Sequence, residues 1–116
     1  MTPEFPATLS LTALADEQLA EARTTGTGRS AHTVHGGQEH ALRQTLIALT
    51  AGSGLAEHNS PGEATLQVLR GRVRLTAAGD SADADAGEFL VIPRLRHSLD
   101  ALADSVVLLT VALRSG

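Results

Sequence analysis

The chain has 116 residues and a mass of 12.0 kDa, which corresponds to a single domain with one hydrophobic core. It contains no cysteine, which excludes disulfides, thiolate nucleophiles and cysteine-ligated metal sites. The net charge of −4 and the scarcity of aromatic residues, with Phe5 and Phe89 alone, disfavour a nucleic-acid partner. All nine basic residues are arginine, so lysine chemistry is excluded as well.

The sequence predicts a soluble, cytoplasmic protein with no membrane partner. Its first residues include Glu4 and lack the basic leader and apolar stretch of a secretion signal. The longest apolar run, from Val106 to Leu113, is interrupted by Thr110 and is too short to span a bilayer.

Residues 1–28 are expected to form an N-terminal helical segment and a loop. Between Leu11 and Arg23 the apolar residues recur at helical spacing, and Ser10 or Thr12 stands where a helix cap is needed. We expect this amphipathic helix to act as a packing element or as part of a dimer contact.

Residues 29–116 are expected to fold as an all-β domain. Glycine, proline, asparagine and aspartate separate short segments typical of strands, and no helical segment lies between them. The strands are predicted at 30–35, 41–50, 54–59, 64–70, 72–77, 81–85, 88–92, 96–102 and 105–113. This spacing indicates an antiparallel sandwich or barrel. The side chains expected to be buried in it are Leu66, Val68, Val73, Leu75, Leu90, Ile92, Leu109 and Val111.

Two stretches of the β region resemble the paired motifs of the cupin superfamily. The first runs from Gly52 through His58 to Gly71 and contains HNSPGEATLQVLRG, and the second is GEFLVIP, from Gly87 to Pro93. The resemblance covers residues 40–113 and is greatest to small single-domain RmlC-like cupins with the cupin type-2 conserved barrel. It implies a cupin-type antiparallel β-barrel (a double-stranded jelly roll) with a short N-terminal helix, and it implies a homodimer.

Cupin metal sites usually consist of three histidines and one glutamate or glutamine, and the resemblance assigns these positions only in part. His58 takes the first position, Ser60 the second and Ala64 the third, while Glu63 lies one residue early. His97 is one residue early for the fourth, so the metal motif is degenerate. His58 and His97 are the remaining ligand candidates, and the weaker ones, on or before the preceding strand, are Gln44 and His40.

Two functions follow from this pattern. The first is the binding of a small organic molecule in a barrel cavity lined by His58, Ser60, Ala64, Leu66 and His97. The second is a metal-dependent enzyme of the dioxygenase, isomerase or decarboxylase type, with iron, manganese, nickel, copper or zinc on His58 and His97. No catalytic residue is assigned. If both histidines face inward, their imidazoles should approach within roughly 3–5 Å, as two ligands of one metal would.

Three further features have both a structural and a functional interpretation. Glu63 is interpreted as a solvated residue after a turn, or as a general base if it is buried near His58. Arg70, Arg72 and Arg74 alternate around Gly71 and are more typical of a solvated sheet face than of a phosphate clamp. Gly71 itself is predicted to occupy a turn that a β-branched residue cannot adopt.

Overall fold

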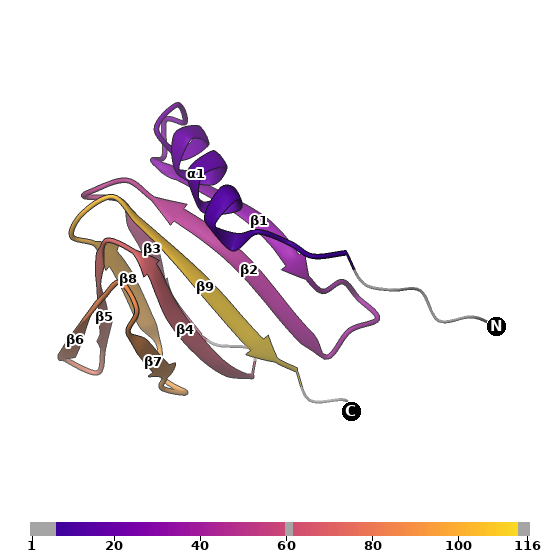
Figure 1. The fold of residues 1–116 in the computed structure, drawn as a ribbon. Coiled ribbons are helices and arrows are strands. Elements are labelled where there is room, and N and C mark those ends of the chain that lie inside the picture. Colours follow the sequence, from indigo (N-terminus) through magenta and orange to yellow (C-terminus); the bar gives the residue numbers. More distant parts are fainter. Residues whose placement is uncertain (1–6, 60–61, 114–116) are drawn as a thin grey trace.

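The structure is a computed structural model that describes residues 7–59 and 62–113, and it consists of two antiparallel sheets and one helix (Figure 1). The five-stranded sheet has the order β1 (Arg29–His35), β2 (Leu42–Leu49), β9 (Ser105–Ala112), β4 (Glu63–Arg70) and β7 (Phe89–Ile92). The four-stranded sheet has the order β3 (Gly54–His58), β8 (His97–Ala101), β5 (Arg72–Ala77) and β6 (Asp80–Asp85). The predicted fold class is confirmed, and each predicted strand lies within two residues of the observed one.

The barrel core lies between the two sheets. Side chains alternate in and out along each strand, so that Leu66 and Val68 of β4 and Val73 and Leu75 of β5 are buried. Ile92 is buried as well, and three of the residues expected in the core are partly buried against it: Leu90, Leu109 and Val111. The predicted core is therefore confirmed.

Helix α1 (Leu11–Ala22) covers part of the outer face of the five-stranded sheet, over β1 and β2 (Figure 1). The hydroxyl of Ser10 accepts a hydrogen bond from the N–H of Ala13 at 3.1 Å and caps the first turn. The apolar face of the helix packs on Leu46, Ala48, Val106 and Leu108 of β2 and β9 in a second core. The helix is thus a packing element of its own chain. It is too short to cross a membrane.

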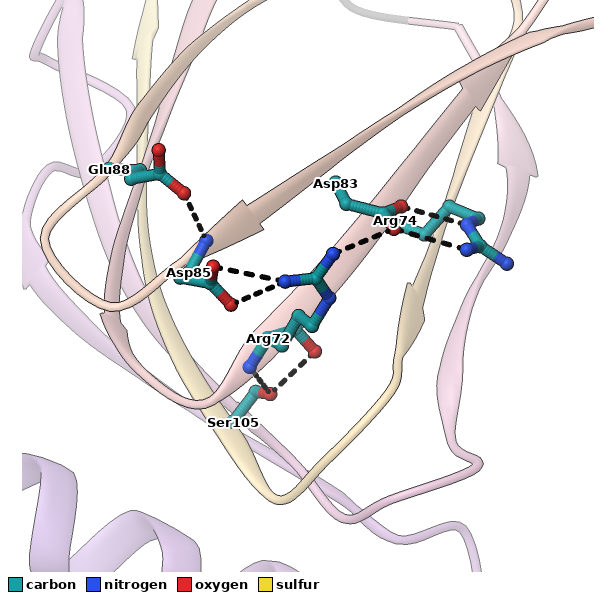
Figure 2. A network of polar contacts seen from close by, with 6 residues as sticks. All are labelled: Arg72, Arg74, Asp83, Asp85, Glu88 and Ser105. Atoms are coloured by element: carbon teal, nitrogen blue, oxygen red, sulfur yellow. Dashed lines mark hydrogen bonds and ion pairs between the residues drawn. The ribbon is translucent and has the colours of Figure 1, made fainter.

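The outer face of the four-stranded sheet carries a ladder of ion pairs (Figure 2). Arg72 donates to Asp85 and Asp83, and Arg74 donates to Asp83 at 2.8 Å. The hydrogen bonds from Arg74 are the main cause of the lowered pKa of Asp83. Arg70, on the other sheet, pairs with Asp16 of the helix. The alternating arginines are therefore part of a solvated sheet face and of the helix contact.

Asp104, in the β8–β9 loop, connects the helix end to the sheet. It accepts a hydrogen bond from the N–H of Ala51 at 2.9 Å and forms an ion pair with Arg23, the residue that follows α1. The bond from Ala51, followed by the bond from Arg23, holds the pKa of Asp104 below the ordinary value for aspartate. A lowered pKa means that the ionised form is stabilised by folding.

We predict that Asp104→Asn lowers the melting temperature at neutral pH but not in acid. The contribution of the ionised carboxylate is fully present above the unfolded pKa and is lost as the pH falls through the lower folded pKa. Thermal unfolding of both proteins from neutral pH down to about pH 2 should therefore give melting curves that converge at the acidic end. Asp80→Asn, on the β5–β6 turn, serves as the control. A gap between wild type and Asp104→Asn that stays constant with pH would contradict the prediction.

Gly71 connects β4 to β5 in a conformation that other residues rarely adopt, with φ at +80°. The backbone also passes close to the next loop there. A Cβ at this position would collide with the carbonyl oxygen of Asp104 and with Ser105. The hydroxyl of Ser105 is held by the backbone of Arg72, so it has little freedom to move away (Figure 2). The turn predicted at Gly71 is confirmed.

Replacement of Gly71 by valine should destabilise the fold by about 1–3 kcal/mol through backbone strain alone, with a further loss from the collision. Gly79→Val is the matched control, because Gly79 has φ at +82° and a Cβ added there would meet nothing within 4 Å. Chemical denaturation should show a larger loss of unfolding free energy for Gly71→Val than for Gly79→Val. Equal losses would mean that the close approach at Gly71 has no energetic effect.

Candidate functional site

His58 and His97 lie opposite each other on the neighbouring strands β3 and β8. Leu55 pairs with Leu99 and His58 pairs with His97, so three steps on β3 match two steps on β8. This is a β-bulge, and its extra residue lies at Ala56 or Glu57. A bulge shifts the alternation of side chains by one residue. It therefore places His58 on the same side of the sheet as Leu55, toward the barrel interior.

The two imidazole rings are in contact. Their centres are 4.5 Å apart and their planes are inclined by 60°. His97 is buried, with 3% of its surface exposed, whereas His58 is exposed to solvent. The pair thus has one ring at the barrel interior and one at the surface, as expected at the mouth of a cavity. The distance lies within the predicted range.

Backbone carbonyls hold both rings. The Nδ1 of His58 lies 2.7 Å from the carbonyl oxygen of Ala56, and the Nδ1 of His97 lies 2.9 Å from that of Leu95. A carbonyl oxygen can only accept, so each Nδ1 carries the proton and donates it. In the neutral rings each Nε2 is then left as an unprotonated acceptor. This is the arrangement by which proteins orient histidines that ligate metals.

An ion pair joins the residues that precede the two histidines. The Nε of Arg96 donates to Glu57 at 2.6 Å, connecting the bulge of β3 to the start of β8. Both side chains are well exposed, so this pair contributes little free energy on its own. Its position matters more, because it ties together the two backbone segments that carry the rings. Glu57 is not among the residues predicted from the sequence; the opposite charges next to each histidine were the available signal.

Beneath the pair lies a small apolar cavity of about 20 Å³. Its walls are the two histidines and the side chains of Ile47, Leu55, Leu66, Leu75, Ile92, Leu99 and Leu109. This volume is enough for about one water molecule. The barrel interior is therefore nearly filled by its own side chains.

Comparison with known proteins identifies the fold through solved structures alone. No protein-family model matches the chain, and no curated protein does. An RmlC-like cupin from Desulfovibrio desulfuricans is 26% identical, with a TM-score of 0.63 over 72% of this chain and 81% of that one. A cupin superfamily protein from Desulfitobacterium hafniense is 14% identical, with a TM-score of 0.68 over 74% and 78%. This chain is a small cupin-fold domain.

Two further neighbours indicate how widely this cupin fold is used. A conserved protein of unknown function from Streptococcus pyogenes is 25% identical, with a TM-score of 0.71 over 79% of this chain and 80% of that one. A salicylate 1,2-dioxygenase from Pseudoaminobacter salicylatoxidans is 23% identical, with a TM-score of 0.73. The match covers 86% of this chain but only 32% of that enzyme, so this likeness concerns the fold.

The other residues that the cupin resemblance assigned lie in different places. Leu66 lines the cavity, and Ala64 is buried in the barrel core without lining this cavity. Ser60 lies outside the described residues. Glu63 is exposed and lies 3.8 Å from Arg94, which agrees with a solvated residue rather than a buried base.

The two weaker ligand candidates do not join the histidine pair. Gln44 lies on the outer face of the five-stranded sheet, where its side-chain amide donates to the hydroxyl of Thr110 at 3.2 Å. His40 is exposed in the β1–β2 turn and stacks on His35, with ring centres 4.8 Å apart. The expectation that either could complete the site is therefore corrected. Within residues 7–59 and 62–113, no group of three or more histidine or acidic side chains is placed to hold one metal.

The protonation of the two rings can be tested directly by nuclear magnetic resonance. Long-range ¹H–¹⁵N spectra at a pH where the rings are neutral should show His58 and His97 in the Nδ1–H form. His32, an exposed residue of β1, is the internal reference. A protonated Nε2 on either ring of the pair would contradict the hydrogen bonds to Ala56 and Leu95.

Proposed function

We propose that this cupin binds a divalent transition metal through the Nε2 atoms of His58 and His97, with water or a small ligand completing the coordination. The observation that carries the proposal is the pair of Nδ1 hydrogen bonds, at 2.7 and 2.9 Å, which leaves both Nε2 atoms as free acceptors. Neutral imidazole is a good ligand for iron, manganese, nickel, copper and zinc, so the residues favour this group of metals without selecting one.

The separation of the rings fits two ligands of one metal. A metal lies about 2.0–2.1 Å from a histidine nitrogen, and hence about 3.2 Å from the centre of the ring. Two rings at a right angle around it would have centres about 4.5 Å apart. The observed distance between the ring centres is 4.5 Å. When bound, such a metal would supply a Lewis acid with open positions for exchangeable ligands.

A site with two protein ligands should bind its metal more weakly than a closed four-ligand site. We therefore expect an exchangeable metal that a chelator removes without unfolding the domain. The fold does not depend on it, because the barrel has a continuous apolar core of its own.

The cavity volume limits the alternative in which an organic molecule occupies the barrel interior. Pockets for organic ligands typically have volumes of about 300–1,000 Å³. The enclosed space beneath the histidines is about 20 Å³. We therefore propose that any organic ligand approaches from the exposed side of His58 and places a polar group at the histidine pair. A dioxygenase, isomerase or decarboxylase reaction would need its substrate in that same position.

The proposal is tested by titration of untagged protein with Ni²⁺, Cu²⁺, Zn²⁺, Mn²⁺ and, without oxygen, Fe²⁺, followed by calorimetry. We expect one equivalent of at least one metal to bind. His58→Ala should weaken that binding by about tenfold or more, because one of two protein ligands is lost. His58 is exposed, so this variant should keep its fold. The control is His32→Ala, which removes an exposed histidine of β1 and should leave the affinity unchanged.

Two results would overturn the proposed function. One is the absence of stoichiometric binding for every metal in the series. The other is binding that His58→Ala leaves intact, since the metal would then be held elsewhere. Circular dichroism of each variant verifies that a loss of binding is not a loss of fold.

A further inference from the structure

Part of the outer face of the five-stranded sheet is apolar and lies beyond the helix. The strand registers place Val91 of β7 beside Thr65 of β4, which is beside Thr110 of β9. Phe89 and Leu42 lie on the same face, one row to either side. Val91 is 70% exposed, Phe89 59% and Leu42 45%. We call this surface, formed by Leu42, Thr65, Phe89, Val91 and Thr110, the β7 face.

The helix does not cover the β7 face. Its apolar residues pack over β1 and β2 and reach β9 only at Val106 and Leu108 (Figure 1). The β7 face extends the same sheet surface past these residues toward β4 and β7. Large exposed apolar side chains on one continuous surface are typical of a binding surface, because leaving them in water costs free energy.

Strand β7 also differs from the other strands that lie at sheet edges. Its sequence is FLVI, which has no polar side chain. The other edge strands, β1, β3 and β6, include charged or other ionisable residues such as Arg29, Glu57 and Asp83. Charged residues on an edge strand prevent association with other chains. Such protection is missing from β7 alone among the edge strands of the described residues.

A groove of about 540 Å³ lies along this surface and is bordered by opposite charges. Thr65, Val91 and Thr110 form part of its floor, and Glu63 and Arg94 lie at its rim. The Glu63 carboxylate and the Arg94 guanidinium are 3.8 Å apart, and their side chains are 76% and 55% exposed. This intrachain pair is long and well solvated, so both groups are available for a better partner.

We propose that the β7 face binds a second copy of this chain in a two-fold symmetric contact. In such a contact the same surface is used on both subunits, so it must be complementary to itself. The β7 face meets this requirement: its apolar centre can pack on the same centre of the partner subunit. Its rim carries one acid and one base, so each Glu63 can pair with Arg94 of the partner subunit. A partner with a single sign of charge would leave one of the two rim groups unpaired.

The outer face of the other sheet offers no comparable surface. Its arginines and aspartates already neutralise one another in the ladder of Arg72, Arg74, Asp83 and Asp85 (Figure 2). Desolvating these charges would cost free energy that a dimer contact would have to recover. The contrast between the two outer faces directs association to the five-stranded sheet. The inference is independent of the histidine pair, which opens elsewhere on the barrel.

Sedimentation velocity on the full chain tests the proposal. We expect a dimer at about 100 µM, a concentration at which a dimer of micromolar affinity is almost fully formed. Val91→Glu should raise the dimer dissociation constant at least about tenfold, because it places two like charges at the centre of the contact. Leu102→Glu is the control: it adds the same charge at an exposed leucine of the β8–β9 loop and should leave the dimer intact.

A charge exchange tests the orientation of the two subunits. Glu63→Arg and Arg94→Glu should each weaken the dimer, and the double variant should restore it, because opposite charges again meet across the two-fold axis. A wild-type chain that is monomeric at this concentration would overturn the proposal. A dimer that tolerates Val91→Glu would overturn it as well, since association would then use another surface. A monomer that becomes a dimer only when residues 1–6 are deleted would assign the β7 face to the chain's own N-terminus and would also overturn it.

Discussion

The whole arrangement depends on strand β9, because it contributes to both hydrophobic cores. It pairs with β2 on one side and with β4 on the other, at the centre of the five-stranded sheet. Val107 points into the barrel, and Val106 and Leu108 point toward the helix. Burial on both faces explains why its sequence, SVVLLTVA, is a continuous apolar run rather than an alternating one.

Much of the fold could be predicted from the sequence, because turns and alternation are local signals. Glycine and proline mark the ends of the strands, and Ser10 marks the start of the helix. Gly71 was predictable for the same reason, since a short turn between two strands needs a positive φ. The family spacing from Gly52 to His58, and from Gly87 to Pro93, added the connection between the strands that local signals cannot supply.

The site was predictable only in part, because it depends on register. Strict alternation from Leu55 would turn His58 away from the barrel, and only the bulge in β3 returns it to the interior. A bulge is set by how two strands pair, and a single sequence carries little trace of it. Gln44 failed as a candidate by the same rule, since its neighbours in β2 face the barrel while it faces outward. His40 failed because it lies in a turn, where no sheet directs its side chain.

The division into two cores has a consequence for how the domain can diverge. Residues that line the barrel interior, such as Leu66 and Leu75, belong to one cluster, and those that hold the helix, such as Leu14 and Leu19, belong to another. Substitutions in clusters that share no contacts have nearly additive effects on the free energy of unfolding. The barrel interior can therefore be enlarged or reshaped, by evolution or by design, while the helix stays in place. A new ligand specificity is accessible in this scaffold without a second set of changes to repair the fold.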